Sequence, residues 1–323
     1  MKILVTGGAG FIGSHFIRLA LRQKPPFTIT NLDKLTYAGN TRNLEDVART
    51  PRYRFLREDI NNADKVDRIM KGHDAVVHFA AETHVDRSIH DADLFLETNV
   101  RGTHNLLRSA LRHRVKRFVH VSTDEVYGST LGRAFRETDI LKPSSPYSAS
   151  KAAGDLLVLS YLTTFGLPVI VTRSSNNYGP CQFPEKFIPL FITRALHGKP
   201  LPLYGDGKNV RNWLYVEDNA EAILRVLKKG RIGEIYNISG DTEKPNITVA
   251  RQIVRLVGEM AGIPVQKIQI QPVTDRLGHD RRYSIDSRKI EKAIGWRPRT
   301  TFEDGLRRTV AWYIRHARSK GGR

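Results

Sequence analysis

The sequence has almost no cysteine and no long apolar run. Cys181 is the only cysteine among 323 residues, so the chain cannot form an internal disulfide, which fits a reducing compartment. The longest apolar stretches, such as that from Leu156 to Leu162, are much shorter than the roughly 20 residues that span a bilayer. No basic segment followed by an apolar one precedes the first strand-like stretch, so we expect no secretory leader. Together these absences predict a soluble, cytoplasmic protein.

Acidic residues are scarce relative to basic ones. The chain has 33 Asp and Glu against 52 Lys and Arg, which gives a formal net charge of +19 at pH 7. Such an excess can bind nucleic acid, but the dense stretches at 101–117 and after Arg276 do not alternate with aromatic residues as single-strand-binding surfaces do. We therefore expect no nucleic-acid partner. The same charge would attract an anionic substrate such as a nucleotide diphosphate, or it is a solvated surface with no specific role.

Apolar strand-like runs alternate with helical patterns through the first half of the chain. The runs lie at 3–5, 28–32, 53–56, 75–79, 117–121 and 169–172, and the helical patterns at 11–22, 63–71, 98–112 and 149–165. Short apolar strands joined by helical crossovers are typical of a parallel sheet covered on both faces. We predict an α/β fold of the Rossmann type, a doubly wound parallel sheet that binds its ligand at the carboxyl ends of the strands.

A glycine-rich loop follows the first strand-like run. Gly7, Gly10 and Gly13 form a G-x-x-G-x-x-G pattern between a strand and an amphipathic helix. Gly7 allows the tight turn, Gly10 lets backbone N–H groups approach a pyrophosphate, and Gly13 lets the helix pack closely on the strand. Asp33 falls 20 residues after Gly13, where a carboxylate accepts a hydrogen bond from a ribose hydroxyl and repels a 2′-phosphate. The pattern predicts NAD rather than NADP as the cofactor.

After about Arg173 the pattern becomes irregular. Prolines cluster at positions 180, 184, 189, 200 and 202, and loops separate shorter elements. A helix near 216–228 and a strand at 234–238 are expected to return to the first domain. We therefore predict an NAD-binding Rossmann domain of residues 1–175 together with about 213–239. A smaller, interleaved C-terminal substrate domain is expected to comprise residues 176–212 and 240–323.

A tyrosine and a lysine are spaced one helical turn apart downstream of the glycine loop. Tyr147 and Lys151 are four residues apart, so both project from one face of a helix. An ammonium group and an oxidised nicotinamide beside the phenol would each favour its ionised form and lower its pKa. The pair could then remove the proton of a carbinol while a hydride leaves its carbon.

Several long motifs carry a resemblance to a known family. They include TGGAGFIGS at 6–14, DKLTYAGN at 33–40, AAETHVDRS at 80–88, STDEVYG at 122–128, SPYSASKA at 145–152, NNYGPCQFPEKFIPL at 176–190, RNWLYVED at 211–218 and DRLGHDRRY at 275–283. On these motifs the chain resembles the dTDP-glucose 4,6-dehydratases of the extended short-chain dehydrogenase/reductase superfamily. The likeness extends over nearly the whole chain and implies a homodimer, as in relatives.

The resemblance gives the pair Asp124-Glu125 a chemical role. It implies that Asp124 is the acid and Glu125 the base that remove water across C5 and C6 of the sugar, after Tyr147 has assisted oxidation at C4. Thr123 would hydrogen-bond near the reacting oxygen, and the hydride would return to C6, so NAD should stay bound. Adjacent strand residues point to opposite faces, so the backbone must leave strand geometry here for both carboxyls to reach one substrate.

The family's binding residues carry over onto matching positions. The catalytic set is Thr123, Asp124, Glu125, Tyr147 and Lys151. The implied NAD pocket consists of Gly7, Gly10, Phe11, Ile12, Gly13, Asp33, Lys34, Leu35, Thr36, Asp59, Ile60, Ala80, Ala81, Glu82, Thr83, His84, Thr98, Tyr147, Lys151 and Asn177. The implied sugar-nucleotide pocket consists of His84, Thr123, Asn176, Lys186, Phe187, Pro202, Leu203, Tyr204, Arg211, Asn246, Asp275, Arg276, Leu277, Gly278 and His279. No spacing of histidines or acids indicates a metal site.

Two departures from the family pattern stand out, and alternatives remain. Leu277 replaces the proline of D-R-P-G-H-D, which would loosen that loop, and Cys181 replaces an aromatic residue. Within the fold, a UDP-glucose 4,6-dehydratase or a nucleotide-sugar 4-epimerase is the alternative, although the Asp124-Glu125 pair argues against an epimerase. Outside enzymes, the alternative is a silent NAD-binding protein that uses its basic surface for a nucleic acid or protein partner. The dTDP specificity depends on overall resemblance.

Overall fold

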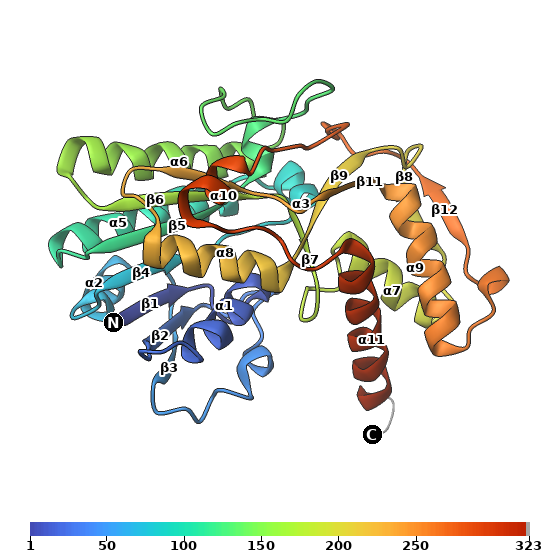
Figure 1. Cartoon of the computed structure of the whole chain (residues 1–323), viewed down its shortest axis with the longest axis horizontal. Coiled ribbons are helices and arrows are strands. Elements are labelled where there is room, and N and C mark those ends of the chain that lie inside the picture. Colours follow the sequence, from blue (N-terminus) through green and yellow to red (C-terminus); the bar gives the residue numbers. More distant parts are fainter. Residues whose placement is uncertain (321–323) are drawn as a thin grey trace.

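The fold is built on a large parallel sheet, in a computed structural model that describes residues 1–320 (Figure 1). The sheet consists of β1 (Lys2–Thr6), β2 (Thr28–Asp33), β3 (Tyr53–Arg57), β4 (Ala75–His78), β5 (Arg117–Thr123), β6 (Val169–Ser174) and β10 (Ile235–Ile238). Its strand order is β10-β6-β5-β4-β1-β2-β3, and every neighbouring pair is parallel. The doubly wound α/β fold predicted from the sequence is therefore confirmed. Strands β2 and β3 are added on one side of β1, and β4, β5 and β6 on the other, so the strand order reverses between β1 and β4. Folds of this type bind their ligands at this reversal.

Helices cover both faces of this sheet. Around it lie α1 (Phe11–Leu21), α2 (Ala63–Met70), α5 (Thr103–Arg112), α6 (Pro146–Phe165), α8 (Val216–Lys229) and α10 (Arg288–Ile294). Ile3 and Val5 of β1 pack into one core together with residues of α1 and α8. Leu4, between them, packs into a second core with residues of α2, α5 and α6. This alternation is why each strand reads as a continuous apolar run.

The helix expected from residue 149 begins earlier, at Pro146. Ser145 caps it, because its hydroxyl accepts the backbone N–H of Ser148 while the Ser148 hydroxyl accepts the N–H of Ser145. Proline is favoured in the first turn of a helix, where its missing N–H costs nothing. The earlier start places Tyr147 in the first turn of α6 and Lys151 one turn further on.

The helix expected from residue 98 is not uniformly α-helical. It is preceded by α3 (Val85–His90) and α4 (Asp93–Phe95), and it opens as a π-helix, η2 (Leu96–Gly102), before α5 begins. The Thr103 hydroxyl donates to the carbonyl of Asn99 within this stretch. Gly102 packs against Ile60, where an added Cβ would lie 2.5 Å from the side chain. The wider turn thus lies beside the sheet's ligand-binding edge.

The remaining elements form a smaller region beside the large sheet (Figure 1). They are β7 (Asn176–Tyr178), α7 (Phe187–Leu196), β8 (Leu201–Tyr204), β9 (Val210–Tyr215), β11 (Thr242–Pro245), α9 (Asn246–Ala261), β12 (Ile270–Val273) and α11 (Phe302–Lys320), with the single turn η4 (Val265–Lys267). Two further single turns belong to the large-sheet region: η1 (Thr41–Leu44) packs on α1, and η3 (Asp124–Tyr127) follows β5. The core of the smaller region contains Phe191, Trp213, Ile253 and Phe302. Between β9 and β11 the chain returns to the large sheet through α8 and β10. The exact domain limits stay a prediction.

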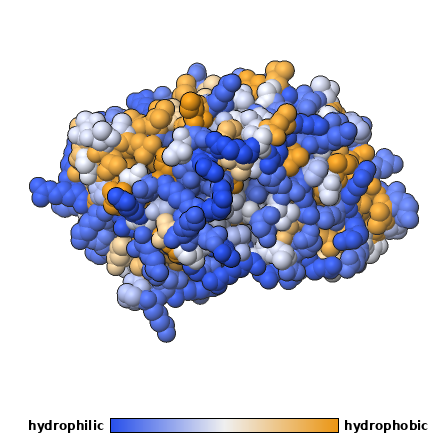
Figure 2. Space-filling view, turned by 45° about the horizontal axis from the view of Figure 1, so that its top comes forward, coloured by the Kyte–Doolittle hydropathy of each residue, from blue (hydrophilic) through white to orange (hydrophobic). Residues whose placement is uncertain are grey.

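Within residues 1–320, no helix is both long enough and apolar enough to cross a membrane. Figure 2 shows one face of the molecule as mostly hydrophilic, with hydrophobic side chains gathered in separate patches. One of these patches lies at the left, the side on which α5 and α6 lie in Figure 1.

Candidate active site

One elongated pocket lies at the carboxyl ends of the strands that surround the reversal between β1 and β4. It begins at the glycine loop after β1, passes the ends of β2 and β4, and reaches the ends of β5 and β6. Its lining includes these predicted residues: Gly7, Gly10, Phe11, Ile12, Gly13, Asp33, Lys34, Thr36, Asp59, Ile60, Ala80, Ala81, Glu82, Thr83, Thr98, Thr123, Asp124, Glu125, Tyr147, Lys151, Asn176, Asn177 and Lys186. The structure thus brings the predicted catalytic set and most of the predicted NAD set together.

The glycine loop has no space for side chains at two of its positions. Gly7 has a φ of 71°, and a Cβ there would lie 2.5 Å from the backbone nitrogen of Ala80. A Cβ on Gly13 would lie 2.5 Å from the carbonyl oxygen of Gly7. Gly10 precedes α1 without a side-chain cap. The first N–H groups of the helix are therefore accessible to an anion in the pocket, as a dinucleotide pyrophosphate requires.

Asp33 lies at the end of β2 with its carboxylate fixed. Its Oδ2 accepts the N–H of Ala9 at 2.9 Å, and its Oδ1 accepts the N–H of Leu35 at 2.8 Å. Burial raises the pKa of this carboxyl, although both backbone contacts oppose the rise. Next to it, Lys34 pairs with Asp59 at 2.7 Å. The geometry fits recognition of a ribose diol by a carboxylate.

The tyrosine and lysine of α6 are both buried at the pocket's inner end. Lys151 Nζ donates to the carbonyl of Val121 at 2.8 Å, and the Ser88 hydroxyl accepts the backbone N–H of Tyr147 at 3.1 Å. Burial lowers the pKa of Lys151 to about 8. The predicted lowering of the Tyr147 pKa is wrong for the protein groups alone. Burial, with the negative charge of Glu125, raises that pKa well above its usual value.

The two adjacent carboxyls lie on a turn of 3₁₀ helix, η3, that begins where β5 ends. Thr123 caps this turn, because its Oγ1 accepts the N–H of Glu125 at 3.2 Å; the hydroxyl itself donates to Asp124 Oδ1 at 3.3 Å. The expectation that the backbone leaves strand geometry here is confirmed. The tighter turn replaces the alternation of a strand, so both residues line the same pocket.

The surroundings of the two carboxyls differ. Burial, and next the charge of Glu125, raise the pKa of Asp124 to about 8. Burial also raises the pKa of Glu125, but the cations Arg211, Arg276 and Lys186 oppose this rise. At neutral pH, Asp124 is therefore suited to donate a proton and Glu125 to accept one.

Tyr283 is a site residue that the sequence reasoning left out. Its hydroxyl donates to Asp280 Oδ2 at 2.7 Å and lies 3.4 Å from Glu125 Oε2. The guanidinium of Arg211 lies over its ring, 4.2 Å from the ring centre. Tyr283 closes the motif DRLGHDRRY that carried the resemblance, so the motif itself was the available signal.

The pocket's rim has further residues that were not predicted. The rings of Tyr37 and Phe183 meet edge to face, 5.4 Å apart, and Arg87 lies 3.9 Å from the centre of the Tyr37 ring. Arg87 also pairs with Glu185 at 2.8 Å. Tyr37, Phe183 and Glu185 line the pocket, and all three lie inside motifs of the resemblance.

Two predicted NAD-pocket residues do not line the pocket. Leu35 lies just outside it with a φ of 58°, and its backbone N–H binds Asp33. His84 caps α3, with its Nδ1 accepting the N–H of Arg87 and its Nε2 3.8 Å from Glu185. Both residues are instead held beside the pocket by residues that line it.

Most of the predicted sugar-nucleotide residues lie outside this pocket. They are His84, Phe187, Pro202, Leu203, Tyr204, Arg211, Asn246, Asp275, Arg276, Leu277, Gly278 and His279. Several of them contact one another: Arg276 lies 5.3 Å from the centre of the Tyr204 ring, and His279 Nδ1 lies 2.6 Å from Asp275 Oδ1. Leu277 is 75% exposed, so the residue that replaces the family's proline makes little contact with the rest of the fold.

The fold and the pocket together define a dinucleotide-dependent enzyme of the short-chain dehydrogenase/reductase type. The strand order and glycine loop provide a dinucleotide site, and the buried tyrosine–lysine pair lies at its inner end. Beside that pair, the buried carboxyl of Asp124 and the half-buried carboxyl of Glu125 add groups for proton transfer.

Residues 4–309 match the family model described as GDP-mannose 4,6 dehydratase. A Streptomyces niveus protein named dTDP-glucose 4,6-dehydratase is 53% identical over 317 residues, covering 97% of this chain and 93% of that protein. A Neisseria meningitidis protein of the same name is 51% identical over 331 residues, with the same two coverages. The chain belongs to this family of nucleotide-sugar dehydratases.

Solved structures agree with this placement. DesIV, a dTDP-glucose 4,6-dehydratase from Streptomyces venezuelae solved with NAD and dTDP bound, is 50% identical; the match covers 99% of this chain and 98% of DesIV, with a TM-score of 0.94. A UDP-glucuronic acid 4-epimerase from Bacillus cereus is 29% identical, with 98% of this chain and 100% of that one covered and a TM-score of 0.90. The fold is thus shared with epimerases, while the sequence lies closer to the dehydratases.

Proposed function

We propose that this protein is an NAD-dependent dTDP-glucose 4,6-dehydratase, a hydro-lyase that makes dTDP-4-keto-6-deoxyglucose. The observation that carries the proposal is the pair Asp124 and Glu125, two carboxyls beside Tyr147 in unlike surroundings: the pKa of Asp124 is raised to about 8, while three cations oppose the rise at Glu125. An epimerase that only oxidises and reduces C4 has no use for this pair. The similarity to named dTDP-glucose dehydratases supports the nucleotide.

The glycine loop and Asp33 would hold the dinucleotide. The cradle that a Cβ at Gly7 or Gly13 would fill fits a pyrophosphate, and the carboxylate of Asp33 fits the adenosine ribose. Lys151 would bind the nicotinamide ribose beside Tyr147. Bound NAD supplies an acceptor for the C4 hydride and returns it at C6, so the cofactor is regenerated in each turnover and we expect it to stay bound.

In the first step, Tyr147 takes the proton of the sugar's 4-hydroxyl as the hydride leaves C4. The positive charges of Lys151 and of the oxidised nicotinamide favour the phenolate and offset the effect of burial. Thr123 hydrogen-bonds near the same oxygen. The C4 ketone that results makes the proton on C5 acidic.

In the second step, the two carboxyls divide the elimination of water. Glu125 takes the C5 proton, because the nearby cations favour its ionised form. Asp124, with a pKa raised to about 8 by burial and by Glu125, gives its proton to the departing 6-hydroxyl. The C5–C6 double bond that forms then accepts the hydride at C6 and a proton at C5, which Glu125 returns.

The residues of the smaller region would bind the nucleotide diphosphate. We assign this role to the predicted sugar-nucleotide set, in which Arg211, Arg276 and Lys186 bring positive charge toward the carboxyls. Charge-assisted contacts of arginine with phosphate oxygens are strong and directional. UDP-glucose remains the alternative substrate.

The decisive experiment uses dTDP-glucose deuterated at C4. Transfer of the label to C6 of the product within one molecule is the expected result, and mass spectrometry of the product checks it. Label that stays at C4 of an epimerised sugar, or no turnover of any hexose nucleotide, would refute the proposal. Parallel assays with UDP-glucose compare kcat/KM for the two nucleotides.

A homodimer that pairs through α5 and α6 is also proposed. Leu156 and Phe165 of α6 are 60% and 54% exposed, and a shallow hollow lies beside them. The hollow is lined by His104, Arg108, Leu111, Arg112, Tyr161 and Phe165. Equilibrium sedimentation should give twice the chain mass, and Leu156→Glu should give the monomer; a monomer for both proteins would contradict the proposal.

A cytoplasmic location, supported by the lack of disulfides, is open to test by cell fractionation.

A further inference from the structure

A buried chain of polar groups lies directly behind Lys151, on the side away from the pocket's mouth. Its centre is Asp155, which is fully buried one helical turn after Lys151 on α6. Arg173 Nε of β6 donates to Asp155 Oδ2 at 2.8 Å, and His120 Nε2 of β5 lies 3.4 Å from Asp155 Oδ1. No role in the reaction described above uses these groups.

Three consecutive residues of β5 contact Lys151 and Asp155. The carbonyl of Val121 accepts from Lys151 Nζ, while the side chains of His120 and Ser122, on either side of it, both contact Asp155. Gly154 packs here too: a Cβ on it would lie 3.0 Å from the carbonyl oxygen of Asn99 and in ordinary contact, at 3.5 Å, with His120 Nε2. The lysine and the aspartate are thus held against the same short piece of strand.

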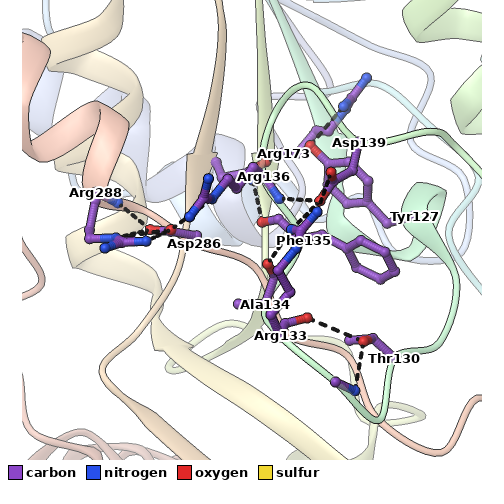
Figure 3. Close-up of polar contacts among 12 residues, drawn as sticks. Tyr127, Thr130, Arg133, Ala134, Phe135, Arg136, Asp139, Arg173, Asp286 and Arg288 are labelled. Carbon is purple, nitrogen blue, oxygen red and sulfur yellow. Dashed lines mark hydrogen bonds and ion pairs between the residues drawn. The ribbon is translucent and has the colours of Figure 1, made fainter.

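The same chain reaches the turn that bears the acid and the base. Arg173 Nη1 donates to the Tyr127 hydroxyl at 2.7 Å, and that hydroxyl donates to Asn237 Oδ1 at 2.9 Å. Figure 3 shows Arg173 beside Tyr127, whose ring stacks on Phe135 with centres 5.2 Å apart. Tyr127 ends η3, two residues after Glu125. Asp155 and Arg173 therefore connect both catalytic segments.

Asp155 pairs directly with Arg173 and not with Lys151, but it is the charged group that favours the protonated form of Lys151. Burial lowers the pKa of His120 and, well below its usual value, that of His78 on β4, so both imidazoles are neutral. Burial opposes ionisation of Asp155, but the contacts with His120 and Arg173 outweigh it and hold the pKa of Asp155 below its ordinary value.

Other charged groups surround α6 at its remaining contacts. The neighbouring elements α3, α4, η2 and α5 carry Asp86, Arg87, His90, Asp93, Glu97, Arg101, His104, Arg108 and Arg112, and η3 carries Asp124 and Glu125. None of them bears on the pKa of Lys151, which burial lowers and Asp155 raises.

We propose that Asp155 is a positioning residue for the reaction: its carboxylate, held by Arg173, keeps the Lys151 ammonium charged beside Tyr147. The inference depends on the proposed function, since it assigns Lys151 the task of favouring the Tyr147 phenolate. Without the carboxylate, two buried cations, Lys151 and Arg173, would share this region uncompensated. Lys151 would then lose its proton at a lower pH, and C4 oxidation would slow.

The test compares the NAD-bound wild type with Asp155→Asn. An opposite charge within reach shifts a pKa by about 1–3 units, so the alkaline limb of kcat should move down by about one pH unit or more. One unit corresponds to about a fivefold loss of kcat at pH 8, because half of the wild-type Lys151, with its pKa of about 8, is still charged there. KM should change little, because Asp155 does not line the pocket. The titration of the Lys151 ζ-¹⁵N resonance, assigned with Lys151→Arg, should move in the same direction.

Two further variants separate electrostatics from folding. Asp155→Asn/Arg173→Met removes both charges of the ion pair, which is often neutral for stability, so this protein should fold. Because only one buried cation then remains, its alkaline limb should be shifted less than that of Asp155→Asn. The matched control is Asp218→Asn. Asp218 is also buried, but its Oδ2 accepts the backbone N–H groups of Arg299 and Thr300. The Asp218→Asn variant should therefore be less stable than the wild type but have the same alkaline limb of kcat.

Each outcome decides one question. If the alkaline limb and the Lys151 resonance of the Asp155 variants titrate as in the wild type, the inference is overturned, whatever the loss of stability. A wild type that does not convert dTDP-glucose defeats the proposed function instead. In that case, the resonance titration still tests whether Asp155 keeps Lys151 charged.

Discussion

Two aspartates near the end of β5 are both almost fully buried, but their pKa values are shifted in opposite directions. Asp124 is 2% exposed and Asp155 is 0% exposed. Burial and Glu125 raise the pKa of Asp124 to about 8. The pKa of Asp155 is lowered even though burial opposes it, because His120 and Arg173 contact its carboxylate. Depth alone therefore does not decide the charge of a carboxyl; the neighbouring groups do.

The difference matches two different tasks. A carboxyl that keeps its proton at neutral pH can give it to a leaving hydroxyl, and Asp124 faces the pocket. A carboxylate that stays ionised serves as a fixed charge, and Asp155 lies behind the pocket against a buried arginine. In the proposed reaction, Asp124 gives its proton to the substrate, whereas Asp155 stays ionised throughout. The following variants test this contrast, from the largest expected effect to the smallest.

Replacing Asp124 by asparagine should have the largest effect, on activity. The amide keeps the shape of the neutral acid but cannot deliver a proton, so kcat should fall by about 10²–10⁴-fold. Oxidation at C4 should continue, since Tyr147 and Lys151 are unchanged. Absorbance of enzyme-bound reduced nicotinamide should therefore accumulate after mixing with dTDP-glucose. An unchanged kcat would contradict the assignment of Asp124 as the acid.

The same variant gives a pH signature in stability. Because the folded pKa of Asp124 is raised to about 8, its contribution to stability is complete below its unfolded pKa near pH ~4 and is lost as pH rises toward 8. The Asp124→Asn protein should lose less stability than the wild type over that window. Urea unfolding at several pH values measures the difference, and parallel curves for the two proteins would count against the raised pKa.

Replacing Arg173 by methionine should have the next largest effect, on stability. It leaves the Asp155 carboxylate buried with a neutral histidine as its main contact, and loss of one partner of a buried pair costs about 3–5 kcal/mol. Since the lowered pKa of Asp155 makes it a source of stability that is lost as pH falls, this variant should also be less sensitive to acid than the wild type. Urea unfolding at neutral and acid pH measures both effects.

Replacing Tyr127 by phenylalanine should cost less. The hydroxyl accepts from Arg173 and donates to Asn237, both of which are buried, so its removal leaves two polar groups without this partner. A loss of about 1–3 kcal/mol is expected. The ion pair with Asp155 remains, so the alkaline limb of kcat should stay in place. A shifted limb would mean that Tyr127, and not Asp155 alone, governs Lys151.

The difference between the two aspartates also shows what the sequence could predict. The strands, the glycine loop and the roles of Asp124 and Glu125 followed from local pattern and from long family motifs. Asp155 is a single acid on a helical pattern, and its partners His120 and Arg173 lie 35 and 18 positions away. Their meeting depends on strand order and register, which place β5 and β6 side by side under α6. No local signal in the chain specifies that contact.

The pKa of Tyr147 in the protein without cofactor depends in the same way on features that the sequence does not show. Spacing alone places an ammonium near the phenol and suggests a lowered pKa. The sequence does not give the depth of burial or the distance to Glu125, which outweigh that effect. Likewise, Tyr37 and Phe183 meet at the pocket's rim only through the fold. Sequence patterns thus identified the residues that line the pocket better than the environment that sets their pKa values.

Replacing Arg288 by alanine should have the smallest effect and forms the surface counterpart of the buried pair. Figure 3 shows Arg288 and Arg136 on either side of Asp286, and Arg288 bonds the carboxylate with both Nε and Nη2. Arg173 bonds Asp155 through Nε alone, so Arg288 makes more hydrogen bonds to its carboxylate, but the Arg288 side chain is 68% exposed. Water solvates both charges when the pair is broken, so the urea midpoint should not move measurably. A loss as large as that of Arg173→Met would show that geometry, and not burial, sets the strength of these pairs.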